Sequence, residues 1–360
     1  MKRIKRPSRK RKAGRIALCT VLTLVVLFAV VSMVAIWQIF QAQFGRFERP
    51  DPATTTQMHY SDLGDDYPRE LVSFHSGQNR LQGYLYSGQG SPGLIVVVHG
   101  LGGGADSYLP EIQYFLDQGW SVFAYDATAS YSSEGEAARG FPQALLDLDA
   151  ALQFVASRPD LAQLPVLLFG HSWGGYAVAN ILHFDHKVAG VVSVAAPNSA
   201  MEIVMEQGRE MLGGLIATQR PFIWMYHWLL YGKTASLSAV DALNKTQIPT
   251  LIIHGTEDSL VKFHGSAIIG KQDRITNPKV RFLALDEEGR AGHNNILRSL
   301  EAMAYLEELR AEQRTLSERY GGDIPPEVQR ELFAQVDRAR VNEVNGELMA
   351  EIHNFFLSCL

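Results

Sequence analysis

Short apolar runs alternate with helical patterns from residue 70 onward. Residues 93–98 are continuously apolar, which is typical of a strand buried on both faces of a sheet. Residues 141–157 instead place Leu145, Leu148 and Leu152 on one side of a helix. Strands are predicted at 70–76, 80–86, 93–98, 120–125, 165–170, 188–196, 250–254 and 280–285, and helices at 108–118, 141–157 and 176–182.

This alternation predicts an α/β fold. Strands separated by helices of this length favour a mainly parallel sheet with helices on both faces. The first two strands are expected to pair as an antiparallel hairpin at one edge of that sheet. Residues 69–360 are long enough for one such domain with additions.

Two segments are longer than connections between the strands and helices of such a fold need to be. Residues 198–245 are too long for an unstructured loop, so we expect a helical cap over the mouth of the site. The alternative is an ordinary amphipathic helix packed on the core. Residues 295–343 carry charged helical patterns and precede a final helix at 344–357. The most aromatic run of the chain falls in the cap, and the candidate substrate-binding rings are Phe222, Trp224, Trp228 and Tyr231.

The first 68 residues have a different pattern. Residues 1–15 contain nine basic residues and no acid, and residues 16–40 contain no charge. As a helix, that uncharged run measures about 37 Å, enough to cross a hydrocarbon core of about 30 Å. We expect a basic cytoplasmic tail (1–15), a transmembrane signal anchor (16–40) and a polar linker (41–68). The run is too long for the apolar region of a cleaved signal peptide.

This arrangement predicts a single-pass protein of the cell membrane whose catalytic domain lies outside the cytoplasm. A nucleic-acid-binding arm is the alternative for the basic residues, but they directly adjoin the apolar run. Without those nine residues the formal net charge of −5 becomes −14, which disfavours nucleic acid as a partner. Cys19 lies in the predicted membrane span and Cys359 is the penultimate residue, so no disulfide between them is expected.

The pentapeptide Gly170-His171-Ser172-Trp173-Gly174 follows a predicted strand and precedes a helix. Gly-x-Ser-x-Gly at that position is typical of a sharp turn that exposes a nucleophilic serine. The glycines remove Cβ atoms that would clash across the turn. The N–H group of Trp173, at the start of the helix, is expected to face a developing oxyanion.

A serine nucleophile needs a base, and the base needs a carboxylate that orients it. Such partners should follow later strands, because ligands bind at the carboxyl ends of strands in an open α/β sheet. Asp258 and His293 stand at such places, in the order Ser-Asp-His. Rival positions are Glu257 for the acid and His171, His254 and His264 for the base.

The glycine-rich stretch 98–104 directly follows a buried strand. It could supply the second oxyanion donor from the Leu101 N–H group, with His99, Gly100 and His171 beside the substrate. The same stretch fits part of a dinucleotide-binding fingerprint, with Asp126 about 20 residues further on. That alternative leaves the serine turn, Asp258 and His293 without a role. No cofactor is expected, and no residue spacing suggests a metal site.

At this point the chain resembles an α/β-hydrolase over residues 70–293, with 344–357 closing the domain. Within that superfamily it is similar to the serine aminopeptidase and monoacylglycerol-lipase branch. The motifs that carry this resemblance are His-Gly-Leu-Gly (99–102), Gly-His-Ser-Trp-Gly-Gly (170–175), His-Gly-Thr-Glu-Asp-Ser-Leu-Val (254–261) and Gly-His-Asn (292–294). The resemblance implies Ser172 as nucleophile, Asp258 as acid, His293 as base, and the amides of Leu101 and Trp173 as oxyanion donors.

Two departures from the relatives affect the substrate. Many relatives have Asp-x-Arg-Gly-His-Gly after the fourth strand, where this chain has Asp126-Ala-Thr-Ala-Ser-Tyr-Ser-Ser-Glu-Gly. The segment between His293 and the final helix is also unusually long. We therefore expect a membrane-anchored serine hydrolase that cleaves small-molecule esters with an apolar acyl or aryl group. The alternatives are a peptidase acting on short peptides and a non-catalytic binding protein on the same fold.

Overall fold

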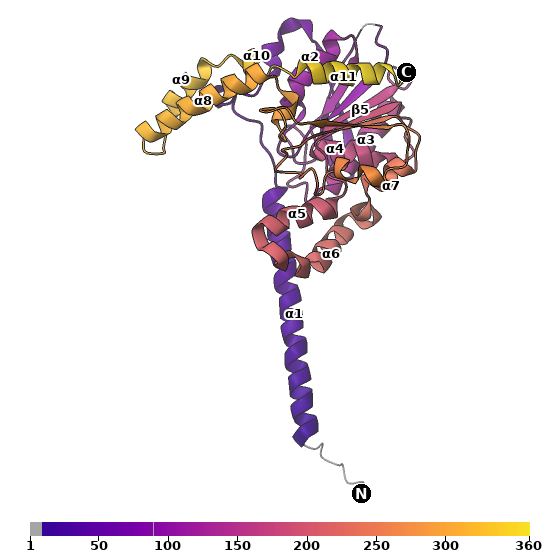
Figure 1. Cartoon of the computed structure of the whole chain (residues 1–360), viewed down its shortest axis with the longest axis vertical. Coiled ribbons are helices and arrows are strands. Elements are labelled where there is room, and N and C mark those ends of the chain that lie inside the picture. Colours follow the sequence, from indigo (N-terminus) through magenta and orange to yellow (C-terminus); the bar gives the residue numbers. More distant parts are fainter. Residues whose placement is uncertain (1–8, 89) are drawn as a thin grey trace.

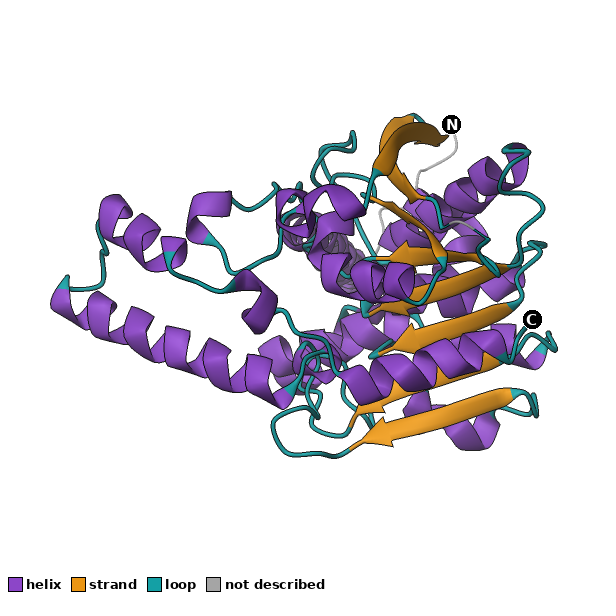
Figure 2. Cartoon of the chain, turned by 90° about the horizontal axis from the view of Figure 1, so that it is seen from above, coloured by secondary structure: helices purple, strands orange, loops and turns teal. Residues whose placement is uncertain are grey.

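A single eight-stranded sheet forms the centre of the protein, as shown by a computed structural model that describes residues 9–88 and 90–360. The strand order is β1-β2-β4-β3-β5-β6-β7-β8. The strands from β3 to β8 pair in parallel, and the β1–β2 hairpin adds antiparallel to β4. Figure 2 shows the sheet from above, with helices on both of its faces. The predicted α/β fold is confirmed.

The strands agree closely with the apolar runs of the sequence. Five of them, from β3 to β7, are buried along nearly their whole length, because helices cover both faces. The bounds are β1 Arg69–Ser76, β2 Asn79–Tyr86, β3 Leu94–Val98, β4 Ser121–Tyr125, β5 Val166–His171, β6 Gly190–Val194, β7 Thr250–Gly255 and β8 Val280–Leu285.

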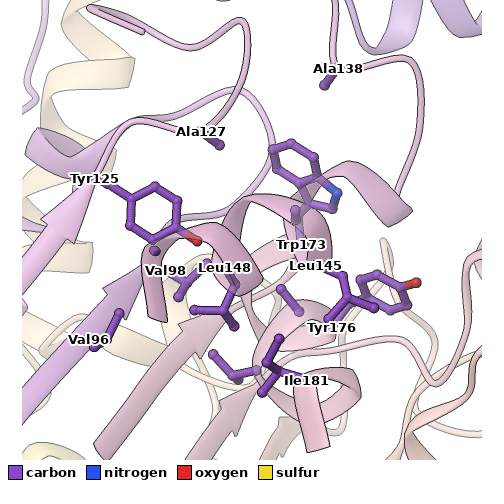
Figure 3. Packing of buried hydrophobic residues seen from close by; sticks show 14 of the residues in the cluster. Val96, Val98, Tyr125, Ala127, Ala138, Leu145, Leu148, Trp173, Tyr176 and Ile181 are labelled. Carbon is purple, nitrogen blue, oxygen red and sulfur yellow. The ribbon is translucent and has the colours of Figure 1, made fainter. Parts of the chain in front are cut away.

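Two pairs of helices cover the sheet. α3 (Pro142–Ser157) and α4 (Trp173–Asn180) pack on one face, where Leu145, Leu148 and Trp173 meet the even-numbered side chains of β3 (Figure 3). α2 (Leu109–Asp117) and α11 (Gly346–Leu357) pack on the other face. The final helix therefore closes the domain, as the sequence predicts.

The cap region is helical, as expected. It consists of α5 (Ala200–Leu212), the 3₁₀ segment η5 (Gly213–Thr218), α6 (Arg220–Tyr231), η6 (Gly232–Ser236) and α7 (Ala239–Asn244). α5 and α6 lie beside the long N-terminal helix, at the end of the domain from which that helix projects (Figure 1). The cap is therefore built around the N-terminal helix.

That helix, α1 (Arg9–Gln43), is the only one in the described part of the chain that is long and apolar enough to cross a membrane. Its last turns are packed against the domain. Ile36, Phe40 and Phe44 are buried, and the Phe40 ring lies 4.7 Å from that of Tyr226 in α6. The predicted basic tail falls partly outside the described residues, since 1–8 are not among them.

The segment 41–68, predicted as a linker, is packed on the domain. Phe47 exchanges backbone hydrogen bonds with the loop after β4, donating to Ala129 and accepting from Tyr131, each at 2.9 Å. The Arg46 guanidinium donates to three carbonyl groups of that same loop. The sequence does not predict this docking, because a polar segment with prolines has the same composition whether it is free or docked. These contacts hold α1 in a fixed direction relative to the sheet.

The charged C-terminal segment forms a helical arm. α8 (Leu300–Arg319), α9 (Pro326–Ala334) and α10 (Arg338–Val341) project from the domain on the side away from α1 (Figure 1). A small apolar cluster joins α8 to the other two helices. Arg338 and Asn342 donate to the carbonyl groups of Pro52 and Thr56, so the arm also contacts the segment 41–68.

Candidate functional site

Ser172 lies at the turn between β5 and α4, with φ 56° and ψ −114°. This conformation is costly for a residue with a Cβ, of order 1–3 kcal/mol, and persists only where the surroundings enforce it. The two flanking glycines explain how the turn fits. A Cβ at Gly170 would collide with the Gly174 backbone, and one at Gly174 would collide with the Val98 carbonyl. The Ser172 hydroxyl is thereby held at the carboxyl end of the sheet.

A chain of hydrogen bonds joins the three predicted catalytic residues. His293 Nε2 lies 2.8 Å from Ser172 Oγ, and His293 Nδ1 lies 2.7 Å from Asp258 Oδ2. A carboxylate oxygen only accepts hydrogen bonds, so the proton is on Nδ1 and the Nε2 lone pair faces the serine hydroxyl. Asp258 and His293 are both buried. The geometry permits transfer of the Ser172 proton to His293.

Asp258 is supported as an anion by its surroundings. Its Oδ1 accepts hydrogen bonds from the backbone N–H groups of Leu260 and Val261, at 2.9 and 2.8 Å. Its Oδ2 also lies 3.2 Å from Nε2 of His254. Burial alone would raise the pKa of Asp258, but the hydrogen bonds from His254 and His293 outweigh it and lower the pKa below its usual value. The carboxylate therefore stays ionised.

His171 connects the base to the glycine-rich loop. Its Nε2–H group donates to the carbonyl of His293 at 2.9 Å, and its Nδ1 accepts from the Tyr108 hydroxyl at 2.7 Å. The same hydroxyl accepts from the Gly100 N–H group at 3.0 Å. Burial lowers the pKa of His171 to about 3, so the ring stays neutral and keeps this pattern. His171 holds the backbone of the base, while its ring also lines the cavity beside the serine.

The glycine-rich loop is held so that one N–H group points toward the serine. His99 Nδ1 donates to the Gly100 carbonyl at 2.7 Å, and its Nε2 accepts from the Ala127 N–H group at 2.9 Å. In a trans peptide the carbonyl and the following N–H group point in opposite directions, so Leu101 N–H is turned away from His99. The N–H groups of Leu101 and Trp173 have no acceptor among the described residues. His99 was predicted to bind substrate, but it lies behind the loop and does not line the cavity.

A cavity of about 1020 Å³ opens from the serine. Its polar end contains Ser107, Asn294 and Arg298 around Ser172 and His293. Its apolar end lies between α1 and the cap. The apolar lining comes mainly from Phe28, Val31, Ile36, Ile39, Phe40, Ile203, Val204, Met211, Leu212, Ile216 and Ile223.

The four predicted cap rings do not line this cavity. Trp224 and Trp228 stack on each other on the outer side of α6, with half of each side chain exposed. Phe222 packs against Phe28 of α1, and the Tyr231 hydroxyl donates to the Ala138 carbonyl. The prediction was wrong because consecutive residues of a helix point in different directions, and the inward position of α6 is taken by Ile223.

The comparisons with known proteins agree with this fold. A family profile described as serine aminopeptidase, S33, matches residues 90–230, which include the glycine-rich loop and the serine turn. An esterase from Pyrococcus furiosus, Pf2001, superposes with a TM-score of 0.53 at 18% identity, over 77% of this chain and 98% of its own. That superposition establishes the shared fold. The chain has the α/β-hydrolase fold, and the profile match and the curated relatives support the α/β-hydrolase superfamily.

Curated relatives match shorter parts of the chain at somewhat higher identity. A polyketide transferase, af380, of Aspergillus fumigatus is 27% identical over 156 residues, which are 40% of this chain and 53% of that protein. The human α/β hydrolase domain-containing protein 17C is 26% identical over 177 residues, or 49% and 45% of the two chains. The chain thus spans about half of the length of the curated relatives that it matches. The catalytic roles of Ser172, Asp258 and His293 remain predictions, now with matching geometry.

The fold excludes the dinucleotide-binding alternative for this α/β hydrolase. Asp126 directly follows β4, and its carboxylate accepts hydrogen bonds from the Tyr84 hydroxyl and from the N–H groups of Ala105 and Ser132. It therefore holds the loop instead of facing a ligand. In the part of the chain that the structure describes, no cluster of three His, Cys, Asp or Glu side chains could hold a metal ion.

Two contributors to the site were not predicted from the sequence. Tyr108 fixes Gly100 and His171, but nothing in the sequence distinguishes it from other tyrosines near a helix start. The second is α1, because residues 16–40 were predicted only as a membrane anchor. A weak signal for its second role exists, since Phe28, Val31, Ser32, Ala35, Ile36, Ile39, Phe40 and Gln43 recur at helical spacing and line the cavity together.

Proposed function

We propose that this α/β hydrolase is a serine esterase that cleaves carboxylic esters with an apolar acyl group. The observation that carries the proposal is the hydrogen-bonded chain Ser172–His293–Asp258 at the end of a largely apolar cavity. A strained serine, a histidine within hydrogen-bond reach of its hydroxyl and a buried carboxylate behind the histidine form the arrangement that activates a serine as a nucleophile.

The mechanism follows from the proton positions. Ser172 Oγ attacks the ester carbonyl carbon while His293 Nε2 takes the hydroxyl proton. The negative oxygen of the tetrahedral intermediate accepts hydrogen bonds from the N–H groups of Leu101 and Trp173. When the carbon–oxygen bond to the alcohol breaks, His293 returns the proton to the leaving oxygen. Water then attacks the acyl-enzyme with the same histidine as base, releasing the acid and restoring Ser172.

The form of the cavity supports an ester with one apolar and one polar part. The acyl chain would lie between α1 and the cap, because most of the side chains that line that end of the cavity are apolar. The alcohol would lie toward Asn294 and Arg298. Arg298 also forms an ion pair with the buried carboxylate of Glu111, which holds it in place.

The peptidase alternative receives little support from the cap. Cap acids could bind the amino terminus of a peptide, but each already has a protein partner. Glu202 is paired with Lys271, Glu206 accepts from Ser266 and the Lys262 N–H group, and Glu210 is paired with the Lys262 ammonium. An incoming ammonium group would compete with these partners for the carboxylate oxygens.

A fluorophosphonate probe tests the chemistry directly. The wild-type protein should be labelled at Ser172, and Ser172→Ala should not be labelled. Turnover of p-nitrophenyl esters of graded chain length should then exceed turnover of aminoacyl-arylamides. A wild-type protein that does not react with the probe would favour a binding protein on this fold, and faster arylamide turnover would favour a peptidase.

We further propose that α1 anchors the enzyme in the cell membrane with the catalytic domain outside the cytoplasm. Support comes from its length, its apolar composition and the basic residues that precede the uncharged run. In sealed cells, protease added outside should degrade the catalytic domain or release it from the membrane. Digestion only after permeabilisation would mean the opposite orientation.

A further inference from the structure

The helix that would cross the membrane also forms one wall of the cavity. Its lining residues extend from Phe28 to Gln43, about 22 Å along the helix axis. They occupy one stripe of α1, whereas Val30, Val34 and Trp37 face outward. The cavity therefore follows the helix for more than four turns.

The length of α1 places part of this wall inside the bilayer. Every described side chain from Lys12 to Phe28 is exposed, and contact with the domain begins at Phe28, whose ring packs against Phe222. The uncharged residues below Phe28, 16–27, measure only about 18 Å as a helix, whereas the hydrocarbon core is about 30 Å thick. About 20 residues are needed, so the span must include residues up to about Ala35. The wall between Phe28 and Ala35 then lies at the depth of the lipid tails.

The cap at the same level has the surface of a membrane-embedded element. Phe222 of α6 touches Phe28, so the two lie at one depth. Residues 211–232 contain a single charged residue, Arg220. An aqueous surface of this size would be about one quarter to one third charged. Large apolar side chains are exposed there instead, namely Met211, Leu212, Leu215, Trp224, Met225, Trp228, Leu229 and Leu230.

The cavity opens on this surface. Phe28 and Val31 of α1 and Met211 and Leu212 at the end of α5 line the cavity, yet 46–68% of each side chain is exposed. These residues are therefore the rim of an opening between α1 and the cap. A rim of apolar side chains at the depth of the lipid tails faces acyl chains and not water.

We propose that the cap surface 211–230 is embedded in the bilayer that α1 crosses, in the leaflet nearer the catalytic domain. Ester lipids of that membrane then reach Ser172 by moving their acyl chain along α1, without leaving the bilayer. The substrate class is thus an ester whose acyl chain is held in the bilayer. The hydrolysis at Ser172 rests on the proposed esterase function. The embedding of the cap and the path along α1 rest on the helix and the cap surface.

Two tryptophan variants test the path along α1. Ala35→Trp places a large ring in the cavity wall, and its control Val34→Trp places the same ring on the outward face one residue away. The full-length enzyme is reconstituted in phosphatidylcholine vesicles with a long-chain monoacyl ester, and assayed separately with p-nitrophenyl acetate. Ala35→Trp should lower the ratio of long-chain to acetate turnover at least tenfold, and Val34→Trp should leave the ratio unchanged. Equal ratios in the two variants would overturn the path.

Embedding of the cap is tested without any activity. The full-length protein is placed in vesicles that contain a phosphatidylcholine with a photoactivatable diazirine acyl chain, and labelled peptides are identified after illumination. Labels are expected within 211–230 as well as in α1, and not around Leu300 or Tyr320, exposed side chains of the C-terminal arm. Labels confined to residues 16–27 would overturn the embedding. If the cap is labelled but no ester is hydrolysed, the esterase proposal is wrong and the embedding of the cap is supported.

Discussion

The two ends of the cavity are specified in different ways. At the polar end, each group is fixed by a directional contact: Ser172 by a strained turn, His293 by Asp258 and by His171. At the apolar end, α1 and the cap present aliphatic side chains whose positions are set only by helical period and packing. Directional chemistry restricts which residue can stand at a position, whereas an apolar wall accepts many. A substitution should therefore affect turnover steeply at the first end and affect selectivity or stability at the second.

The largest expected effect tests the polar end. Ser172→Ala should lower kcat by about 10⁴–10⁶, because the nucleophile is lost while the fold is kept. His293→Ala should cost about as much, and the double variant should cost little more, since the two act as a unit. Single-turnover and steady-state assays with a p-nitrophenyl ester measure this. A Ser172→Ala enzyme with near wild-type turnover would end the proposed mechanism.

The two faces of α6 provide a contrast at the apolar end. Ile223 is buried and lines the cavity, so Ile223→Ala should reduce the free energy of unfolding by about 2–5 kcal/mol. Trp224→Ser, on the outward face, should reduce it by no more than about 1.5 kcal/mol, because it removes only the stacking on Trp228. Thermal unfolding in detergent compares them. A larger loss for Trp224→Ser would mean that its ring is part of the core and that the assignment of the two faces is incorrect.

His171 should show an intermediate effect, through positioning alone. His171→Phe removes the hydrogen bond to the His293 carbonyl and leaves the Tyr108 hydroxyl without its acceptor. Loss of such buried contacts costs about 1–3 kcal/mol, so kcat should fall about 10–100-fold with a smaller change in KM. His171→Gln, which retains a donor, should recover part of kcat. A change confined to KM would show that His171 only contacts the substrate.

The smallest effect is a dependence of stability on pH. Burial lowers the pKa of His171 to about 3, and burial also lowers that of His99. In the unfolded chain both titrate near 6.5, so below that pH the unfolded state binds more protons. Their contribution to stability is complete above pH 6.5 and decreases as the pH falls toward the folded-state pKa. His171 alone should account for about 1 kcal/mol between pH 7 and pH 5.5.

Melting temperatures of the wild type and of His171→Phe across that range test this dependence. The variant should lose less stability on acidification than the wild type. Parallel curves for the two proteins would mean that His171 does not carry the acid sensitivity.

Local chemistry accounts for the parts of the molecule that the sequence predicts well. The strands from β3 to β7 follow from continuous apolar runs, and the serine turn follows from two glycines that leave room for a neighbouring backbone. Asp258 and His293 are predictable because parallel strands bring their carboxyl ends to one edge. Each of these inferences needs only a few neighbouring residues and one rule of geometry.

Contacts between distant segments account for what the sequence did not reveal. The loop after β4 binds the segment that follows α1, through contacts with Arg46 and Phe47. The cap tryptophans looked suited to a pocket, but the neighbour that settles their direction is α1, some 200 residues earlier. The hydrophobic effect is not directional, so an apolar stripe in the sequence does not indicate whether it faces a core, a lipid or a substrate.

The sequence by itself determined the fold class, the order of the strands along the chain, and which serine, histidine and aspartate could react. These features depend on backbone geometry and hydrogen-bond chemistry, which short motifs specify. Only the tertiary structure decided that the predicted membrane helix is also a wall of the cavity. That role depends on where the segment 41–68 and the cap dock, and docking is the sum of many weak contacts between residues far apart in the chain.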